Sequence, residues 1–243
     1  MKTSTVALPF FALALASSPA FGYVLVGTSD GAMVHWDTSA LSVGLDPTMP
    51  SASVSSADAA QALDAALATW TDAAGGKLTL SPAEADARPD TIVLVRFHQD
   101  DWPYQANLLA YTQLYAHQVS GQITSAVIEV NERDHHFSVD GDRGRYDLQA
   151  VLTHELGHLI GLGHSLDPQA SMHSGTAPGD AHQRNLDDDD RAGLTAIEAM
   201  QSMGAAGGCS FSPASPGSSG ALVMMILFGL LGLAARRRRP SGC

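Results

Sequence analysis

Cysteine is nearly absent from this sequence, and its two copies, Cys209 and Cys243, both lie towards the C-terminal end. They stand on opposite sides of an uninterrupted apolar run over residues 221–235. Because a segment of this kind is expected to keep its two ends apart, we predict no structural disulfide between the two cysteines.

Basic residues are also scarce, with 13 Lys and Arg against 25 Asp and Glu. Five of the basic residues, Lys2 and the run 236–239, belong to the terminal segments, so the body has 8 basic and 25 acidic residues, a net charge near −17 (8 − 25). Such an acidic body argues against nucleic acid or anionic lipid as its partner. Solubility alone is enough to explain the charge.

Apolar runs of full membrane-spanning length are lacking as well. The longest, ALVMMILFGLLGLAA, has fifteen residues and is followed by four arginines, whereas a permanent transmembrane helix needs about twenty residues. We interpret residues 221–243 as a hydrophobic helix plus Arg cluster that serves as a sorting or anchor tail, with the arginines on the cytoplasmic side. Residues 204–220, rich in Gly, Ser and Pro, are interpreted as a flexible linker.

The N-terminal segment has the form of a secretory signal peptide. Lys2 precedes the short apolar stretch VALPFFALALA, and the small-residue stretch SSPAFG follows. This order is typical of a cleaved signal and not of a membrane span, so we assign residues 1–22 to it, with cleavage after Ala20 or Gly22. Residues 23–203 then remain as one soluble domain with one core.

The central motif is HELGHLIGLGH over residues 154–164. On a helix, His154 and His158 project from one face about one turn apart, so both imidazoles can bind a single ion. Glu155 points to the side of that pair, where it can take a proton from a water molecule. Gly161 lets the chain turn sharply enough for His164 to reach the same ion. Three neutral imidazoles suit zinc in an open catalytic site.

The motif resembles the zinc signature of the metzincin metalloproteases. Ser165 follows the third histidine, and Met172 comes eight residues after it. These features are similar to the matrixins, in which such a methionine forms the Met-turn beneath the zinc. Adamalysins carry Asp and astacins Glu at the position of Ser165. Ser174 stands where astacins and serralysins have a tyrosine ligand, so no fifth ligand is expected. As a residue type, Met172 is also consistent with a plain core methionine.

The resemblance implies an α+β fold over residues 23–203: a zincin-like domain with a twisted, mostly parallel sheet, an active-site helix, and a small C-terminal subdomain ending in a helix. Apolar residues at helical spacing predict a helix over 56–74 with Trp70 in the core, capped by Ser56 and stopped at Gly75-Gly76. The run 91–97 predicts a strand buried on both faces.

Residues 121–131 alternate like a half-exposed strand, which in matrixins is the edge of the sheet above the cleft. An extended substrate adds to that edge by β-augmentation. The same resemblance implies that the backbone of Leu109 and Ala110 lies along the bound peptide.

Outside residues 154–164, the histidines and aspartates of the sequence match no known metal-binding pattern. Four histidines outside the motif are interpreted as surface residues: His98, His117, His135 and His136. Calcium is possible but is not supported by a motif, because Asp140, Asp142 and Asp147 do not meet the EF-hand spacing. A turn followed by a helix cap at Asp147 explains them more simply. No cysteine precedes the zinc motif, so latency by a cysteine switch is not expected.

The C-terminal tail resembles the MYXO-CTERM type of sorting signal, which joins a cysteine, a short hydrophobic helix and an Arg cluster. The resemblance implies that an intramembrane sorting protease cuts near Cys209 and that lipid on this cysteine anchors the product. Alternatively, Cys209 is incidental and the helix itself gives the membrane association. Either reading places an exported protein at the cell surface, in the outer envelope or outside the cell.

The sequence therefore predicts a zinc endopeptidase acting on protein or peptide substrates. His154, His158 and His164 would hold one zinc ion, and Glu155 would act as general base. Two alternatives stay open: a catalytically silent, zinc-containing surface binding protein, and an aminopeptidase with the same motif. Substrate, S1′ specificity, latency mechanism and oligomeric state are not readable from the sequence.

Overall fold

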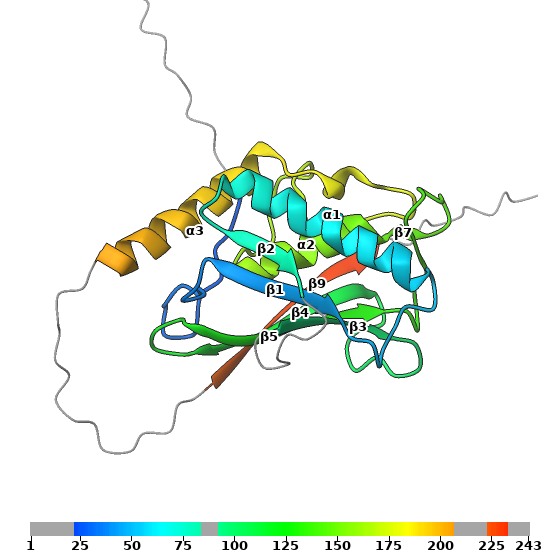
Figure 1. Ribbon diagram of the computed structural model, residues 1–243, viewed down its shortest axis with the longest axis horizontal. Coiled ribbons are helices and arrows are strands. Elements are labelled where there is room, and N and C mark those ends of the chain that lie inside the picture. Colours follow the sequence, from blue (N-terminus) through cyan, green and yellow to red (C-terminus); the bar gives the residue numbers. More distant parts are fainter. Residues whose placement is uncertain (1–21, 84–91, 207–222, 233–243) are drawn as a thin grey trace, which may run out of the picture.

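A seven-stranded sheet lies on one side of the domain, with the helices packed above it (Figure 1). The computed structural model describes residues 22–83, 92–206 and 223–232. The strands of the sheet are β1 (Ala40–Leu45), β2 (Thr79–Pro82), β3 (Ile92–His98), β4 (Leu108–His117), β5 (Ile123–Asn131), β8 (Gly175–Thr176) and β9 (Val223–Gly232). The remaining elements are β6 (Phe137–Ser138), β7 (Tyr146–Asp147), the helices α1 (Ser56–Ala74), α2 (Leu148–Ile160) and α3 (Asp188–Ala206), and the short 3₁₀ helix η2 (His182–Arg184).

The order of strands in the sheet is β2-β1-β3-β5-β4-β9-β8. The first four are parallel to one another, β4 runs antiparallel to both of its neighbours, and β8 is parallel to β9. This arrangement confirms the predicted mixed fold with a mostly parallel sheet and an active-site helix. The short strands β6 and β7 form a second, two-stranded sheet directly before the N-terminus of α2.

Strand β5 is not the edge of the sheet, and the prediction for residues 121–131 was wrong on this point. The strand lies between β3 and β4, and it is buried at four consecutive positions from Ile128 to Asn131. The exposed residues Thr124 and Ser125, which suggested alternation, occupy only its first half. We expected β5 to be the strand nearest the motif. Strand β4 is in that position, because it contacts α2.

Helix α1 forms over the predicted residues because its apolar face is covered by the rest of the core. Its N-cap is Ser55, one residue before the predicted cap, and the Ser55 side chain accepts a hydrogen bond from the Asp58 N–H at 3.1 Å. Gly75 ends the helix in the left-handed conformation with φ 57°. Trp70 is fully buried, and its indole Nε1–H donates to the carbonyl of Thr153 at 2.8 Å. This bond fixes α1 against the helix that carries the motif.

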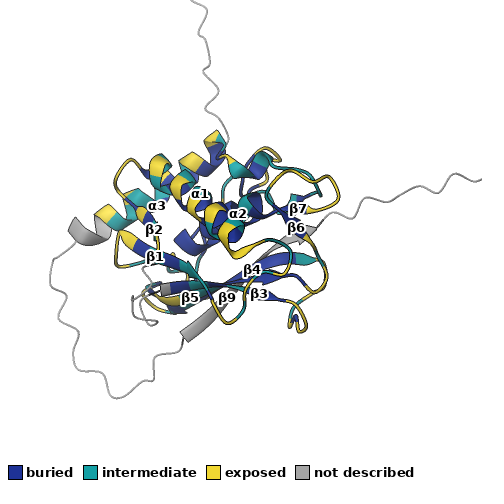
Figure 2. Cartoon of the chain, turned by 45° about the vertical axis from the view of Figure 1, so that its right-hand side comes forward, coloured by how far each residue is buried: buried dark blue, intermediate teal, exposed yellow. Residues whose placement is uncertain are grey.

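Helix α2 is buried along almost its whole length (Figure 2). As predicted, Asp147 caps it, accepting from the Ala150 N–H at 2.9 Å. The same carboxylate binds the guanidinium Nε of Arg184 at 2.7 Å. A buried helix with a firmly held start gives a rigid frame for side chains that must meet at one point.

The apolar tail forms a strand over Val223–Gly232, where we expected a helix. A continuous apolar run carries no periodicity that separates helix from strand. The outer edge of β4 offers unpaired backbone groups, and pairing with them satisfies the backbone of the tail. No helix among the described residues is both long and apolar enough to cross a membrane.

Several predicted segments lie outside the described residues. These are residues 1–21 of the signal peptide, most of the linker with Cys209, and the arginine cluster. Helix α3 continues to Ala206.

Candidate metal centre

Helix α2 and the turn after it bring three histidines together. His154 and His158 are fully buried on one face of α2. Gly161 then ends the helix with φ 108°, a left-handed conformation that glycine adopts without strain. The chain turns back, and His164 comes to face the other two, with ring centroids 5.3 Å from His154 and 4.8 Å from His158. One ligand atom from each histidine lies within 4.8 Å of the others.

Two backbone carbonyls set the orientation of the helical histidines. The Nδ1 atom of His154 lies 2.7 Å from the carbonyl oxygen of Ser171, and that of His158 lies 2.7 Å from the carbonyl oxygen of Leu162. A carbonyl can only accept, so each Nδ1 carries the proton and each Nε2 carries a lone pair. This is the tautomer that leaves Nε2 available to a metal.

The spacing of these nitrogens fits a zinc ion. The Nε2 atoms of His154 and His158 are 3.0 Å apart. Two ligands at about 2.0–2.1 Å from a tetrahedral zinc would be roughly 3.3 Å apart. Two lone pairs facing each other so closely repel, and a cation between them removes the repulsion. The donor set and its geometry therefore suit a divalent metal.

Burial keeps the imidazoles neutral, which is the form that binds metal. Burial, with the neighbouring His164 as a smaller cause, lowers the pKa of His154 to about 3. Burial and the two neighbouring histidines lower the pKa of His158 well below its ordinary value. The pKa of His164 is also lowered, mainly by burial. All three side chains are thus ready to act as ligands at neutral pH.

Glu155 is fully buried beside the histidines and is bonded to the sheet. Its carboxylate Oε2 accepts a hydrogen bond from the hydroxyl of Thr112 on β4 at 2.6 Å. Thr112 is itself fully buried. Sequence reasoning did not identify Thr112, because no local pattern shows which residue of a strand will face a helix folded more than forty positions later.

Met172 packs against helix α2 beside Gly157. It is buried, and a side chain at Gly157 of α2 would collide with its sulfur atom and with Trp70. Glycine at position 157 thus permits the close approach of the Met-turn to the helix. The Met172 carbonyl accepts from the Ser165 N–H at 2.8 Å, which ties the turn to the residue after the third histidine.

The acidic start of α3 holds the Met-turn from the other side. The buried Asp190 carboxylate accepts hydrogen bonds from the N–H groups of Ser171 at 2.7 Å and Met172 at 3.0 Å. From the sequence, the acidic run 187–190 is explained as a helix start that the helix dipole favours, and this contact is not predicted. An acidic residue in a first helical turn carries no sequence signal for such a partner.

The other predicted site residues are placed as follows. Leu109 and Ala110 are buried on β4, and Ala110 pairs with Leu230 of β9. The carboxylate of Asp142 accepts from the Gly144 N–H at 2.8 Å, as expected of a turn. Within the described residues, the three histidines of the motif form the one group of this kind able to hold a metal ion.

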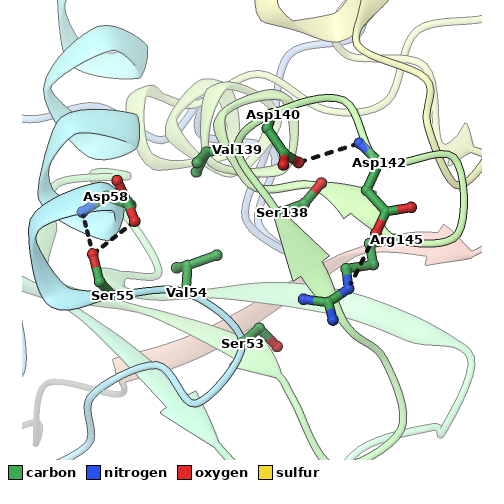
Figure 3. A pocket seen from close by; sticks show the side chains of 9 residues that line it. All are labelled: Ser53, Val54, Ser55, Asp58, Ser138, Val139, Asp140, Asp142 and Arg145. Carbon is green, nitrogen blue, oxygen red and sulfur yellow. Dashed lines mark hydrogen bonds and ion pairs between the residues drawn. The ribbon is translucent and has the colours of Figure 1, made fainter.

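A separate surface hollow of about 400 Å³ lies between the start of α1 and the loop before β7 (Figure 3). Its polar side chains bond to one another: the Ser55 hydroxyl donates to Asp58 at 2.7 Å, and Arg145 lies 3.4 Å from Asp142. None of the three motif histidines lines it. The chemistry of the molecule is therefore centred on the histidines of α2 and not on this hollow.

The mixed sheet, the buried helix with two histidines and a glutamate, and the third histidine after a glycine turn together define a zinc metalloprotease class of domain. Within that class, the chain belongs to the matrixin family. The matrixin family model matches residues 35–198, which is more than half of the chain.

A curated relative supports the same assignment. The chain is 33% identical over 144 residues to matrix metalloproteinase-25 of Mus musculus. The match covers 56% of this chain and 22% of that protein, so the chain spans only about a fifth of the relative it matches. Membership of the family implies zinc as the metal and a hydrolase of the metalloprotease type.

Proposed function

We propose that this protein is a zinc-dependent endopeptidase that cleaves peptide bonds within protein substrates. The single observation that carries the proposal is the convergence of three neutral histidines beside a buried glutamate bonded to the sheet. A binding protein would need the ligands but would have no use for a carboxylate held at this position.

His154, His158 and His164 would hold the zinc through their Nε2 atoms or, for His164, either ring nitrogen. When bound, zinc would polarise the scissile carbonyl and make a bound water more acidic. The Glu155 carboxylate takes a proton from that water and passes it to the leaving amine. Thr112 holds Oε2 of this carboxylate in place by donating its hydroxyl proton.

The proposal also places the protein outside the cytoplasm. Residues 1–22 supply the signal for export, and Cys209 is the proposed site of lipid attachment after a sorting protease acts on the tail. Cell fractionation with an antibody against the domain tests this placement. Finding the full-length chain in the cytosol would contradict it.

The catalytic proposal is tested by Glu155→Ala in the full chain. We expect wild-type protein to contain one zinc and to cleave casein or gelatin in a chelator-sensitive manner. The variant should lose cleavage by a factor of about 10²–10⁴, which is what general-base catalysis typically contributes. Its zinc content should stay at one per chain.

The control is Glu198→Ala, a glutamate of α3 whose partner is the exposed Lys77, which should leave cleavage unchanged. Products from a peptide with a blocked amino terminus distinguish an endopeptidase from an aminopeptidase. Zinc binding without cleavage of any unfolded protein would favour the silent binding protein instead.

A further inference from the structure

Strand β9 has a neighbouring strand on each side, and these two neighbours run in opposite directions. It runs antiparallel to β4 over its whole length, from His117 opposite Val223 to Leu108 opposite Leu231. On its other side it is parallel to β8, with Gly175 opposite Leu231. In Figure 1 it is the orange-red arrow labelled β9. A segment from the C-terminal end of the chain thus completes the sheet.

Strand β9 lies against the helix that carries the candidate metal centre. The strand lies against α2, which carries His154, His158 and Glu155. Phe228 pairs with Thr112, the residue whose hydroxyl bonds to Glu155. Strand β8, the other neighbour of β9, begins three residues after Met172. The backbone of β9 therefore fills the space between β4 and β8 next to the motif helix, and we call this space the groove.

The residues of β4 and of the motif are buried, as expected if a peptide segment occupies the groove beside them. Strand β4 is buried at six consecutive positions, Leu109–Leu114, although an open edge strand would expose alternate side chains. Glu155 has 0% of its surface exposed, as does Thr112. A general base must meet water and substrate, so a fully covered Glu155 belongs to a closed state of the site.

We propose that, in the chain whose tail has not been cut, residues 223–232 are the resident ligand of this groove and compete there with substrate. The inference rests on the proposed function, because it takes the groove along β4 to be where substrate binds. Strand addition to a sheet edge is a general mode of peptide recognition in which the backbone supplies most of the hydrogen bonds. The segment VMMILFGLLG suits this mode, since it contains no charge and no proline.

The connection between domain and ligand is long enough for binding within one chain. Residues 207–222 separate α3 from β9, and sixteen extended residues reach up to roughly 55 Å. A ligand on such a tether has a high effective concentration, on the order of millimolar. A free peptide must therefore displace β9, and extended apolar peptides are the class best matched to the groove.

The test opens the groove in the full chain with Leu227→Pro combined with Phe228→Pro. Consecutive N–H groups of a strand point in opposite directions, so one of these two prolines removes a hydrogen bond to β4. The matched control places two prolines at Ser218 and Ser219, in the segment that joins α3 to β9. Two quantities are measured on zinc-loaded protein: amide hydrogen exchange of Leu108–His117, and the affinity of a peptide hydroxamate, a zinc-binding substrate mimic.

We expect exchange of the β4 amides to become at least ten times faster in the β9 variant, and the hydroxamate to bind at least ten times more tightly. The linker control should behave as wild type. Unchanged exchange and affinity in the β9 variant would overturn the inference.

Neither measurement requires turnover, and both are repeated with Glu155→Ala. If β4 exchange and hydroxamate affinity change as expected but no variant cleaves peptide, the resident strand is supported and the peptidase proposal fails. If wild type cleaves peptide as fast as the β9 variant, with both showing the same β4 exchange, the peptidase stands and the resident strand does not.

Discussion

The carboxylate of Glu155 accepts a hydrogen bond from a side chain of the sheet. Thr112 donates its hydroxyl to Oε2 at 2.6 Å, and both residues are fully buried. A short hydrogen bond to a charged acceptor in such surroundings fixes the position of the acceptor. Glu155, the proposed general base, is therefore positioned from two elements, its own helix and β4.

Thr112→Val should lower kcat about tenfold, the equivalent of about 1.4 kcal/mol, because the carboxylate loses its fixed position and one charge-assisted hydrogen bond. KM should stay within a factor of about two, since Thr112 acts through Glu155. Both constants are measured with a fluorogenic peptide, alongside zinc content.

Thr112→Ser is the matched control, because it keeps the hydroxyl and loses only a methyl group. It should retain most of the wild-type kcat. Equal activity of the Val and wild-type proteins would show that helix α2 alone positions Glu155.

At the residue scale, the sequence allowed prediction of every group whose role depends on local spacing. The three histidines, Glu155 and the turn glycine follow from helical geometry within eleven positions. Thr112 and Asp190 could not be predicted, because each meets its partner only after distant segments pack. Spacing shows which side chains share a helix face but not what covers that face.

At the scale of elements, α2 combines a buried interior with titratable ligands. Burial holds the pKa of His154 at about 3, against an ordinary value of 6.5. The same desolvation lowers the pKa of His158. Because the folded protein keeps these histidines neutral, any proton that binds to them in the unfolded chain stabilises the unfolded state. The free energy of unfolding therefore falls at a pH where the unfolded histidines become protonated.

Without metal, the protein should therefore lose stability as the pH falls below 6.5. Between pH 6.5 and about 3, the unfolded chain binds a proton at His154 that the folded chain does not, so the free energy of unfolding rises with pH across this window. The slope is on the order of 1.4 kcal/mol per pH unit for one such histidine, and His158 adds to it in the same direction. Urea unfolding of chelator-treated protein at several pH values measures it.

His154→Gln should reduce this slope, and the same substitution at the exposed His136 serves as the control. A free energy of unfolding that does not vary between pH 7 and pH 5 would show that the folded site takes up protons freely. Zinc-loaded protein should show a dependence at least as steep, because bound metal holds all three histidines unprotonated in the folded state while the unfolded chain still takes up protons.

Among the elements, helices were predicted more accurately than sheet positions. Caps and apolar spacing placed α1 and α2 to within a residue, because both signals are local. The position of β5 in the sheet was wrong, and the tail formed a strand and not a helix, because strand order and edge pairing depend on which segments meet in space. Local pattern shows that a segment is apolar but not which partner satisfies its backbone.

At the scale of the whole molecule, two aspartates of α3 join segments from both ends of the domain. Asp189 accepts from the N–H of Tyr23 at 3.0 Å and from the hydroxyl of Ser165 at 2.6 Å. Asp190 accepts from the Met-turn, and from the Asp187 N–H at 2.9 Å. The first residues of the domain, the loop after the third histidine and the last helix are thus connected around the metal centre.

Asp190→Asn should lower the free energy of unfolding by about 2–3 kcal/mol, because an amide has one acceptor oxygen where the carboxylate has two. Burial raises the pKa of Asp190 against the effect of its backbone donors, so the charged form already carries a desolvation cost that the substitution relieves. The lost acceptor should outweigh that relief, since Oδ2 alone accepts from the N–H groups of both Ser171 and Asp187. At least one buried N–H would then face the amide's own donors.

The matched control is Asp188→Asn, the same change at an exposed position in the first turn of α3, which should alter the free energy of unfolding by less than about 0.5 kcal/mol. Zinc affinity adds a second readout, because the Ser171 carbonyl orients His154 and the Ser171 N–H is bound by Asp190. A looser Met-turn should weaken zinc binding in Asp190→Asn and not in the control. Reduced stability with unchanged zinc affinity would mean that α3 supports the fold without setting the geometry of the metal ligands.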